Sequence, residues 1–201
     1  FPKTLKRLAV DLDASADSII YIEGFFSFVR TVEDLQLKLK NYPDFNSKWQ
    51  YIGSAISKIQ SLKHLEIIFA RDFYEFITSS RVDNFFQGFG TMNKLESLKV
   101  YSYEDPLPGY LAKSLRNFPS LNTLDLSFSG ATTKTLNLLG DSLLTSIQKL
   151  RLLFFHLRDE DGIFQHFSKC LKNIGQLKDF EFVIIRGKIS CKSILYLASA
   201  L

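Results

Sequence analysis

One short apolar pattern recurs along the whole chain and restricts the folds that the chain can adopt. The pattern is apolar-x-x-apolar-x-apolar, and its first residues lie 27, 30, 33, 26, 26 and 30 positions apart. The seven copies are Leu5/Leu8/Val10, Val32/Leu35/Leu37, Leu62/Leu65/Ile67, Leu95/Leu98/Val100, Leu121/Leu124/Leu126, Ile147/Leu150/Leu152 and Leu177/Phe180/Phe182. A single copy would carry little weight in a chain that is 46% apolar, but seven copies at a nearly constant spacing indicate a repeat architecture.

The segments before four of these copies carry apolar residues at steps of three, four and three. They are Ile19/Ile22/Phe26/Val29, Trp49/Ile52/Ile56/Ile59, Val82/Phe85/Phe89/Met92 and Phe164/Phe167/Leu171/Ile174. Such steps are typical of one face of a helix, whereas the alternation within each motif, as in Leu124-Asp125-Leu126, is typical of a strand. The sequence therefore predicts a repeated strand–helix unit whose apolar faces are buried by stacking one unit on the next.

Local signals refine the expected helix boundaries. Asp105 and Pro106 suit the cap and the first position of a helix, and Ser190 is a further capping candidate. In the fifth unit Gly140 stands where an apolar stripe residue is expected, so we expect that helix to be kinked or shifted.

The motif, the unit length and the helix in every unit resemble the leucine-rich-repeat family, and its ribonuclease-inhibitor-like subclass in particular. The resemblance implies an α/β solenoid, a right-handed βα superhelix with a parallel sheet on the concave face and helices on the convex face. It also implies about seven repeats forming one domain over residues 1–201. The family usually has Asn or Cys three residues after the last strand residue, but here those positions hold Asp13, Lys40, Ala70, Tyr103, Ser129, Phe155 and Ile185. We therefore expect looser or longer turns after the strands.

Both ends of the chain fall within the repeat pattern. Leu5 begins a motif almost at once, Leu201 lies in the last helical stripe, and neither end shows the polar unit that shields the terminal core of a solenoid. We expect the chain to be a segment of a longer protein, or to be covered at both ends.

Composition argues against several classes of function. The net charge of +4 comes from basic residues spread along the chain, which does not favour nucleic-acid binding. The longest apolar stretch, 19–29, is interrupted by Glu23 and Gly24, so no membrane span is expected. Two cysteines, Cys170 and Cys191, cannot form a secreted disulfide framework. We expect an intracellular, cytoplasmic protein without cofactors.

Equivalent residues of a parallel sheet lie side by side, which places two rows of outward-facing residues on the concave face. The first row is Ala9, Gln36, Glu66, Lys99, Asp125, Arg151 and Glu181, and its alternating signs favour a self-neutralising ladder over a ligand-binding array. The second row is Asp11, Lys38, Ile68, Tyr101, Ser127, Leu153 and Val183, and its apolar members form a candidate contact strip unless a loop covers them. Tyr101 and Leu153 are the expected anchors. The candidate partner-binding residues are Ile68, Tyr101, Leu153, Val183, His64, Lys99 and Arg151.

Two groups of residues could carry chemistry, but the sequence supports them less well than it supports the contact strip. Asp34, His64 and Ser97 fall on adjacent predicted strands in triad order, but no glycine donors or obvious cleft accompany Ser97. His166 and Cys170 are four residues apart on a predicted helix, a spacing that can hold zinc, but neither His156 nor Cys191 is placed to complete the site. We interpret the pair as a rim histidine and a buried thiol, and we expect neither catalysis nor a metal.

The function favoured by this reasoning is that of a protein–protein interaction scaffold. Its partner would be another protein or a large assembly, bound through the concave face and the adjoining loops, and a small-molecule substrate is not expected. The alternative is a regulatory module of an enzyme, such as a GTPase-activator-like or substrate-recognition leucine-rich-repeat subunit.

Overall fold

The computed structural model describes residues 5–13, 18–40, 49–70, 80–157 and 163–201, without the side chains of residues 13, 18–20, 23, 80, 81 and 103–106. Within these ranges, strands and helices alternate strictly along the chain. The strands are β1 (Arg7–Asp13), β2 (Asp34–Lys40), β3 (His64–Phe69), β4 (Ser97–Pro106), β5 (Thr123–Gly130), β6 (Lys149–Phe154) and β7 (Asp179–Ile184). The helices are α1 (Ser18–Phe28), α2 (Trp49–Ser57), α3 (Ser80–Gln87), α4 (Gly109–Ser114), α5 (Thr133–Ser142), α6 (Ile163–Lys172) and α7 (Cys191–Ala198), and a 3₁₀ turn (Leu115–Asn117) follows α4.

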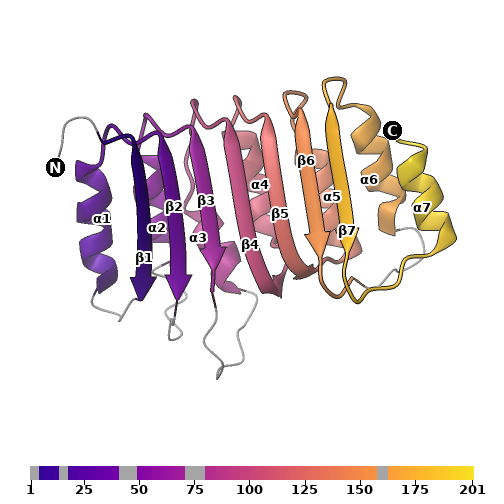
Figure 1. Ribbon diagram of the computed structural model, residues 1–201, viewed down its shortest axis with the longest axis horizontal. Coiled ribbons are helices and arrows are strands. Elements are labelled where there is room, and N and C mark those ends of the chain that lie inside the picture. The colour runs from indigo at the N-terminus through magenta and orange to yellow at the C-terminus, as the bar shows by residue number, and fades with distance from the viewer. Residues whose placement is uncertain (1–4, 14–17, 41–48, 71–79, 158–162) are drawn as a thin grey trace.

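The strands form one parallel sheet in which the spatial order is the sequence order, β1 to β7. Pairing is in register with the repeat, so that Leu65 lies beside Leu98, and Leu124 beside Leu150. All the helices lie on one side of the sheet, and the two termini are at opposite ends of the row of strands (Figure 1). This arrangement confirms the expected α/β, leucine-rich-repeat-like solenoid with a parallel sheet. On the opposite side of the sheet, which we term the open face, the described residues form no helix (Figure 1).

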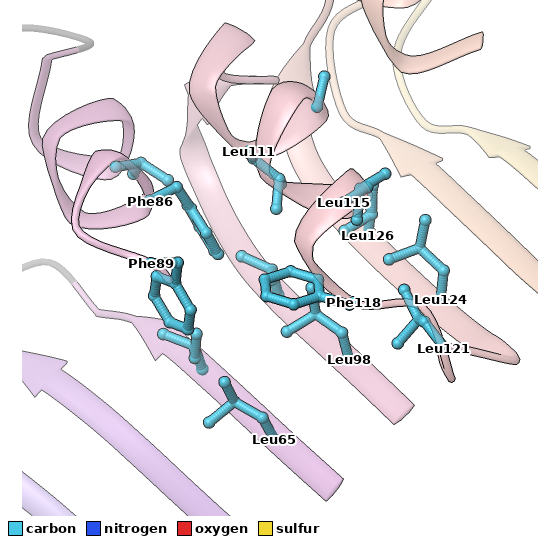
Figure 2. Close-up of a cluster of buried hydrophobic side chains, with 14 of the residues drawn as sticks. Leu65, Phe86, Phe89, Leu98, Leu111, Leu115, Phe118, Leu121, Leu124 and Leu126 are labelled. Carbon is cyan, nitrogen blue, oxygen red and sulfur yellow. The ribbon is translucent and has the colours of Figure 1, made fainter. Parts of the chain in front are cut away.

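A single apolar interior fills the space between the sheet and the helices. Strand residues such as Leu98 and Leu124 and helical residues such as Leu111 meet there, and each is fully buried (Figure 2). Phenylalanine rings connect neighbouring units: the rings of Phe89 and Phe118 lie 5.9 Å apart, edge to face. Each unit therefore buries its apolar strand and helix faces against the next unit, which explains why the repeat spacing is maintained along the chain.

The helices predicted from the four apolar stripes are present as α1, α2, α3 and α6, and the final stripe residues lie just beyond the helix ends. Val29, Ile59 and Ile174 each donate a backbone N–H to the carbonyl three residues earlier, in the turn that leads to the next strand. The prediction of a helix start at Asp105 and Pro106 was wrong. Strand β4 extends to Pro106, which pairs with Gly130, and α4 begins at Gly109.

Two other local expectations concern the cap at Ser190 and the glycine at Gly140. Ser190 does cap α7, because its hydroxyl accepts the amide proton of Ser193. Gly140 lies inside an unbroken α5, whose buried stripe is shifted and runs through Leu136 and Leu139. A side chain at Gly140 would crowd α6, since a Cβ there would lie 3.1 Å from the sulfur of Cys170. Helix packing therefore explains this departure from the repeat.

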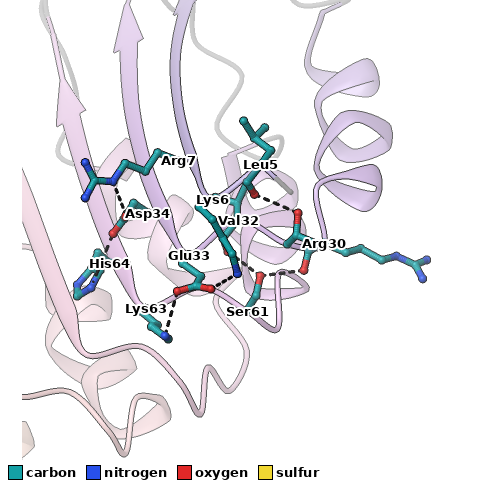
Figure 3. Close-up of polar contacts among 11 residues, drawn as sticks. Leu5, Lys6, Arg7, Arg30, Val32, Glu33, Asp34, Ser61, Lys63 and His64 are labelled. Atoms are coloured by element: carbon teal, nitrogen blue, oxygen red, sulfur yellow. Dashed lines mark hydrogen bonds and ion pairs between the residues drawn. The ribbon is translucent and has the colours of Figure 1, made fainter. Parts of the chain in front are cut away.

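Hydroxyl side chains before the strands tie successive units together. Ser61 donates to the carbonyls of Arg30 and Val32 at 2.8 and 2.6 Å (Figure 3). The equivalent bonds elsewhere run from Thr31 to Leu5, Ser120 to Asn93 and Ser146 to Leu121. Backbone carbonyls just before the strands also join successive units, and each accepts two amide protons from the following unit. These carbonyls belong to Lys6, Glu33, Lys63, Glu96, Asn122 and Gln148. These bonds lie at the start of the strands, whereas the Asn or Cys residues that are usual in leucine-rich repeats lie after the strands.

Candidate functional site

The open face of the sheet displays the residues that the pleat turns away from the core. In β4, Leu98 and Val100 are fully buried, whereas Ser97, Lys99 and Tyr101 alternate with them. The in-register pairing then aligns equivalent residues of all strands into rows across the face. The two predicted rows are therefore present on this face.

The first row, which we term the charge row, is largely neutralised from within. Gln36 donates to Glu66 at 3.1 Å. Arg151 bridges two acids, with its Nη1 3.3 Å from Asp125 and its Nε 2.8 Å from Glu181. This confirms the predicted ladder for these residues, and it means that Arg151 is already engaged within the sheet.

Lys99 differs from its neighbours in the charge row. It lies in register between Glu66 and Asp125. Glu66 accepts a hydrogen bond from Gln36, and Asp125 is paired with Arg151 and with the Tyr101 hydroxyl. In the part of the chain that the structure describes, Lys99 makes no hydrogen bond or ion pair. An ammonium group that is unpaired among the described residues therefore lies near the middle of the open face.

Tyr101 belongs to the second row and reaches across to the next strand. Its hydroxyl donates to Asp125 Oδ2 at 2.9 Å. Burial first, and then the adjacent Asp125 carboxylate, raise the pKa of Tyr101 well above its ordinary value of 10. Tyr101 therefore stays protonated at neutral pH and can keep its hydrogen bond to Asp125; its register neighbour on β3 is Ile68.

The second row is not the continuous exposed strip that its sequence favours. Ile68, Tyr101 and Val183 are half-buried, but Ser127 and Leu153 are only 1% and 8% exposed. Leu153 consequently offers a partner little surface, and replacing it by Asp would bury a charge and disturb folding. The apolar residues of this row that a partner can reach are the neighbours Ile68 and Tyr101 and, apart from them, Val183.

A shallow hollow of about 790 Å³ lies on the open face near its N-terminal end. Its lining includes Arg7, Asp34, His64, Ser97 and Lys99. Asp34 is held between Arg7 Nε at 3.0 Å and His64 Nε2 at 3.7 Å. The hollow was not foreseen from sequence, because it arises from several side chains on four adjacent strands.

The triad order of Asp34, His64 and Ser97 does not become triad geometry. His64 and Ser97 are register neighbours, yet no hydrogen bond joins them among the described residues. A triad also requires donors placed for an oxyanion, and the hollow is open and lined by side chains. Among the described residues, His64 therefore pairs with Asp34 but makes no hydrogen bond to Ser97.

An ion-pair cluster lies beside the hollow, at the starts of the strands. Glu33 is paired with Lys6 and with Lys63, whose Nζ is 3.0 Å from Glu33 Oε2 (Figure 3). The bond from Lys6, followed by that from Lys63, lowers the pKa of Glu33 to about 2. These charges join three consecutive units and leave Glu33 fully ionised at neutral pH.

The helical side of the molecule brings together three potential ligands. His166 Nε2 lies 2.6 Å from Asp141 Oδ1 and 3.5 Å from Cys170 Sγ, and that sulfur lies 3.8 Å from the same Asp141 oxygen. Burial first, and then Asp141, raise the pKa of the Cys170 thiol. Sequence reasoning found His166 and Cys170 but missed Asp141, which lies 25 residues before His166, on α5. Aligning the helices one unit apart could have found it.

Comparisons with known proteins assign no family. No protein-family model and no curated protein sequence matches the chain. Among solved structures, it is similar to the LRR ectodomain of the plant membrane receptor kinase GASSHO1/SCHENGEN3 from Arabidopsis thaliana, determined in complex with CASPARIAN STRIP INTEGRITY FACTOR 2. The identity is 15% and the TM-score 0.38, over 96% of this chain. The chain spans 20% of that chain's length, and its leucine-rich-repeat-like character rests on its own strand and helix order.

The length and apolar character of the helices decide whether any of them could cross a bilayer. Among the described residues, none of them combines the length and the apolar character needed for a crossing.

Proposed function

We propose that this chain is a protein-interaction scaffold whose partner lies on the open face of the sheet, over Ile68, Lys99 and Tyr101. The observation that carries the proposal is Lys99, which has no charged partner in the described part of the chain, whereas the other charges of its row are engaged. A half-buried aromatic and aliphatic pair suits the centre of an interface, and the unpaired charge beside it would select a partner of opposite charge.

The chemistry of this face defines the partner. A carboxylate on the partner would pair with Lys99, and an apolar side chain would pack on Ile68 and the ring of Tyr101. Glu66 and Asp125 flank Lys99, so the field there is mixed in sign, which disfavours a polyanion such as nucleic acid. The partner is therefore a protein segment that carries an acidic residue next to an apolar one.

The hollow extends the same surface toward the N-terminal strands. His64 is half exposed there, and Ser97 lies between it and Thr123 in the same row. These groups would accept or donate hydrogen bonds to the partner's backbone and would fix its orientation. Arg151 and Val183 would contribute to binding at the other end of the face. Arg151 would act indirectly, by holding Asp125 and Glu181 in position.

Finer features of the architecture belong to the same proposal. A helix follows every strand in the described chain, and this supports a ribonuclease-inhibitor-like solenoid of seven repeats, a right-handed superhelix with the open face on its concave side. Both cysteines are free thiols, which supports an intracellular, cytoplasmic location.

Site-specific photo-crosslinking in cells of the source organism tests the proposal. A photoreactive amino acid at Ile68 should capture a defined partner, and the same group at Tyr51, a 52% exposed residue of α2, should not. Adding Lys99→Glu to the Ile68 probe should abolish the capture. Equal capture from both positions, or capture only from Tyr51, would contradict the proposal.

A further inference from the structure

We propose that Asp141, His166 and Cys170 form a zinc-binding site between α5 and α6, on the helical side of the molecule. The site is independent of the open face, and no part of the proposed scaffold function requires it. The three potential ligand atoms all lie within 4.8 Å of one another.

The distances between the donor atoms suit tetrahedral zinc. Bonds of roughly 2.0–2.3 Å to nitrogen, oxygen and sulfur at tetrahedral angles place ligand atoms about 3.4–3.6 Å apart. The observed separations of Cys170 Sγ from His166 Nε2 and Asp141 Oδ1 are 3.5 and 3.8 Å. The third separation, 2.6 Å between His166 Nε2 and Asp141 Oδ1, is a hydrogen bond. An ion that replaced this hydrogen bond would need the two groups to separate by less than about 1 Å.

The convergence on one histidine nitrogen distinguishes this cluster from a catalytic triad. In a Cys–His–Asp triad, the two ring nitrogens have different partners, one facing the nucleophile and the other the acid. Here a single atom, His166 Nε2, faces both Cys170 and Asp141. Such an arrangement directs three donors toward one point, as metal coordination does and as a proton relay does not.

The helices hold the donors in place. His166 and Cys170 are one turn apart on α6 and therefore project from the same face. Asp141 comes from the last turn of α5, next to Gly140. A Cβ at Gly140 would lie 3.1 Å from Cys170 Sγ and 3.2 Å from its Cβ, so a side chain there would press on the cluster. The glycine that interrupts the apolar stripe thus leaves room for the sulfur.

The donor set selects the class of ion. Imidazole and thiolate together suit zinc and similar transition metals, whereas calcium and magnesium require oxygen ligands. Binding would displace the thiol proton of Cys170 to solvent. Asp141 and His166 are 48% and 44% exposed, so an ion can reach them. Three protein ligands leave a fourth position for water or for a donor from another molecule.

Cobalt substitution tests the site in the intact chain, under a reductant that contains no thiol. Co²⁺ should produce a sulfur-to-cobalt charge-transfer band and the visible bands of tetrahedral coordination, at one ion per chain. Zn²⁺ should then displace it. Cys170→Ser should remove the charge-transfer band, and His166→Ala should weaken Zn²⁺ binding by at least about 100-fold, more than the loss of an outer-sphere partner causes.

Matched controls make the result decisive. Cys191→Ser and His156→Ala remove the same donor types from other parts of the chain, and both variants should bind Zn²⁺ as the parent does. Asp141→Asn should weaken binding by at least about tenfold. Circular dichroism of each variant checks that it is folded. The proposal is overturned if the folded parent gives no tetrahedral cobalt spectrum, if Cys170→Ser keeps the band, or if Cys191→Ser loses it.

Discussion

Helices α2 and α3 approach each other closely at Gly53, which allows the stacking of units to be tested by adding one methyl group. Gly53 lies in α2 and faces α3. A Cβ at Gly53 would stand 2.2 Å from the backbone carbonyl oxygen of Phe85, closer than the 3.0 Å that real Cβ atoms essentially never pass. A backbone oxygen cannot rotate away, so α2 and α3 would have to separate by about 0.8 Å to accept Gly53→Ala.

A second glycine provides the control. Gly24 lies in α1, and nothing lies within 4 Å of a Cβ built there. Both substitutions replace a helical glycine by alanine, which stabilises a helix by about 0.8–1.0 kcal/mol. Gly24→Ala should therefore raise the free energy of unfolding by about 1 kcal/mol. Gly53→Ala has the same gain in helix stability, but overpacking costs about 1–3 kcal/mol and should be near the upper end here. The free energy of unfolding should therefore fall by about 2 kcal/mol.

Urea denaturation of both variants, followed by circular dichroism at 222 nm, measures the difference. We expect the two unfolding free energies to differ by about 3 kcal/mol, with opposite signs relative to the parent. If Gly53→Ala were as stable as Gly24→Ala, α2 and α3 would not be packed as described, and the reasoning about stacked units would fail.

Three further substitutions test other parts of the account. Ser61→Ala removes a donor to two carbonyls of the preceding unit and should cost about 1–2 kcal/mol in urea denaturation, whereas no change would show that the hydroxyl ladder does not stabilise the stack. Phe118→Ala should cost about 3–5 kcal/mol by the same measurement, because the ring is fully buried between units, and a cost below 1 kcal/mol would place it outside the core. Glu33 has its pKa lowered from 4.5 to about 2 by Lys6 and Lys63, so its stabilising effect is present above pH 4.5 and is lost as the pH falls toward 2. Glu33→Gln should therefore flatten the fall in urea midpoint between pH 4.5 and 2, and an unchanged slope would show that the ion pairs do not operate in solution.

The fold could be predicted from the sequence because two periodicities point to the same repeated unit. Steps of three and four before Leu62 and alternation within Leu124-Asp125-Leu126 each specify one element, and the constant spacing requires that the units stack. Helix starts were less predictable. The residues at 105 and 106 have the chemistry of a cap, but pairing of Pro106 with Gly130 extends the strand instead. Tertiary pairing overrode the local signal there.

The candidate sites were predictable only in part, because the sequence repeat determines strand register but not the contacts of individual side chains. In-register pairing of a parallel sheet follows from the repeat, so the charge row and its Arg151 bridge could be foreseen. The burial of Leu153 could not, because its place in the outward-facing row predicts exposure. Asp141 was missed because its approach to His166 depends on the contact between α5 and α6 at Gly140, which no pattern within one helix reveals.

The binding role of the open face is tested most directly by comparing two charge reversals in one affinity measurement. Lys99 lies on the open face, and Lys134 is an exposed residue of α5. Replacing either by Glu changes the net charge equally. Calorimetric titration against the crosslinked partner should show binding weakened at least about tenfold by Lys99→Glu, and by less than about twofold by Lys134→Glu. Equal effects of the two substitutions, or a larger effect of Lys134→Glu, would contradict the assignment of the open face as the binding surface.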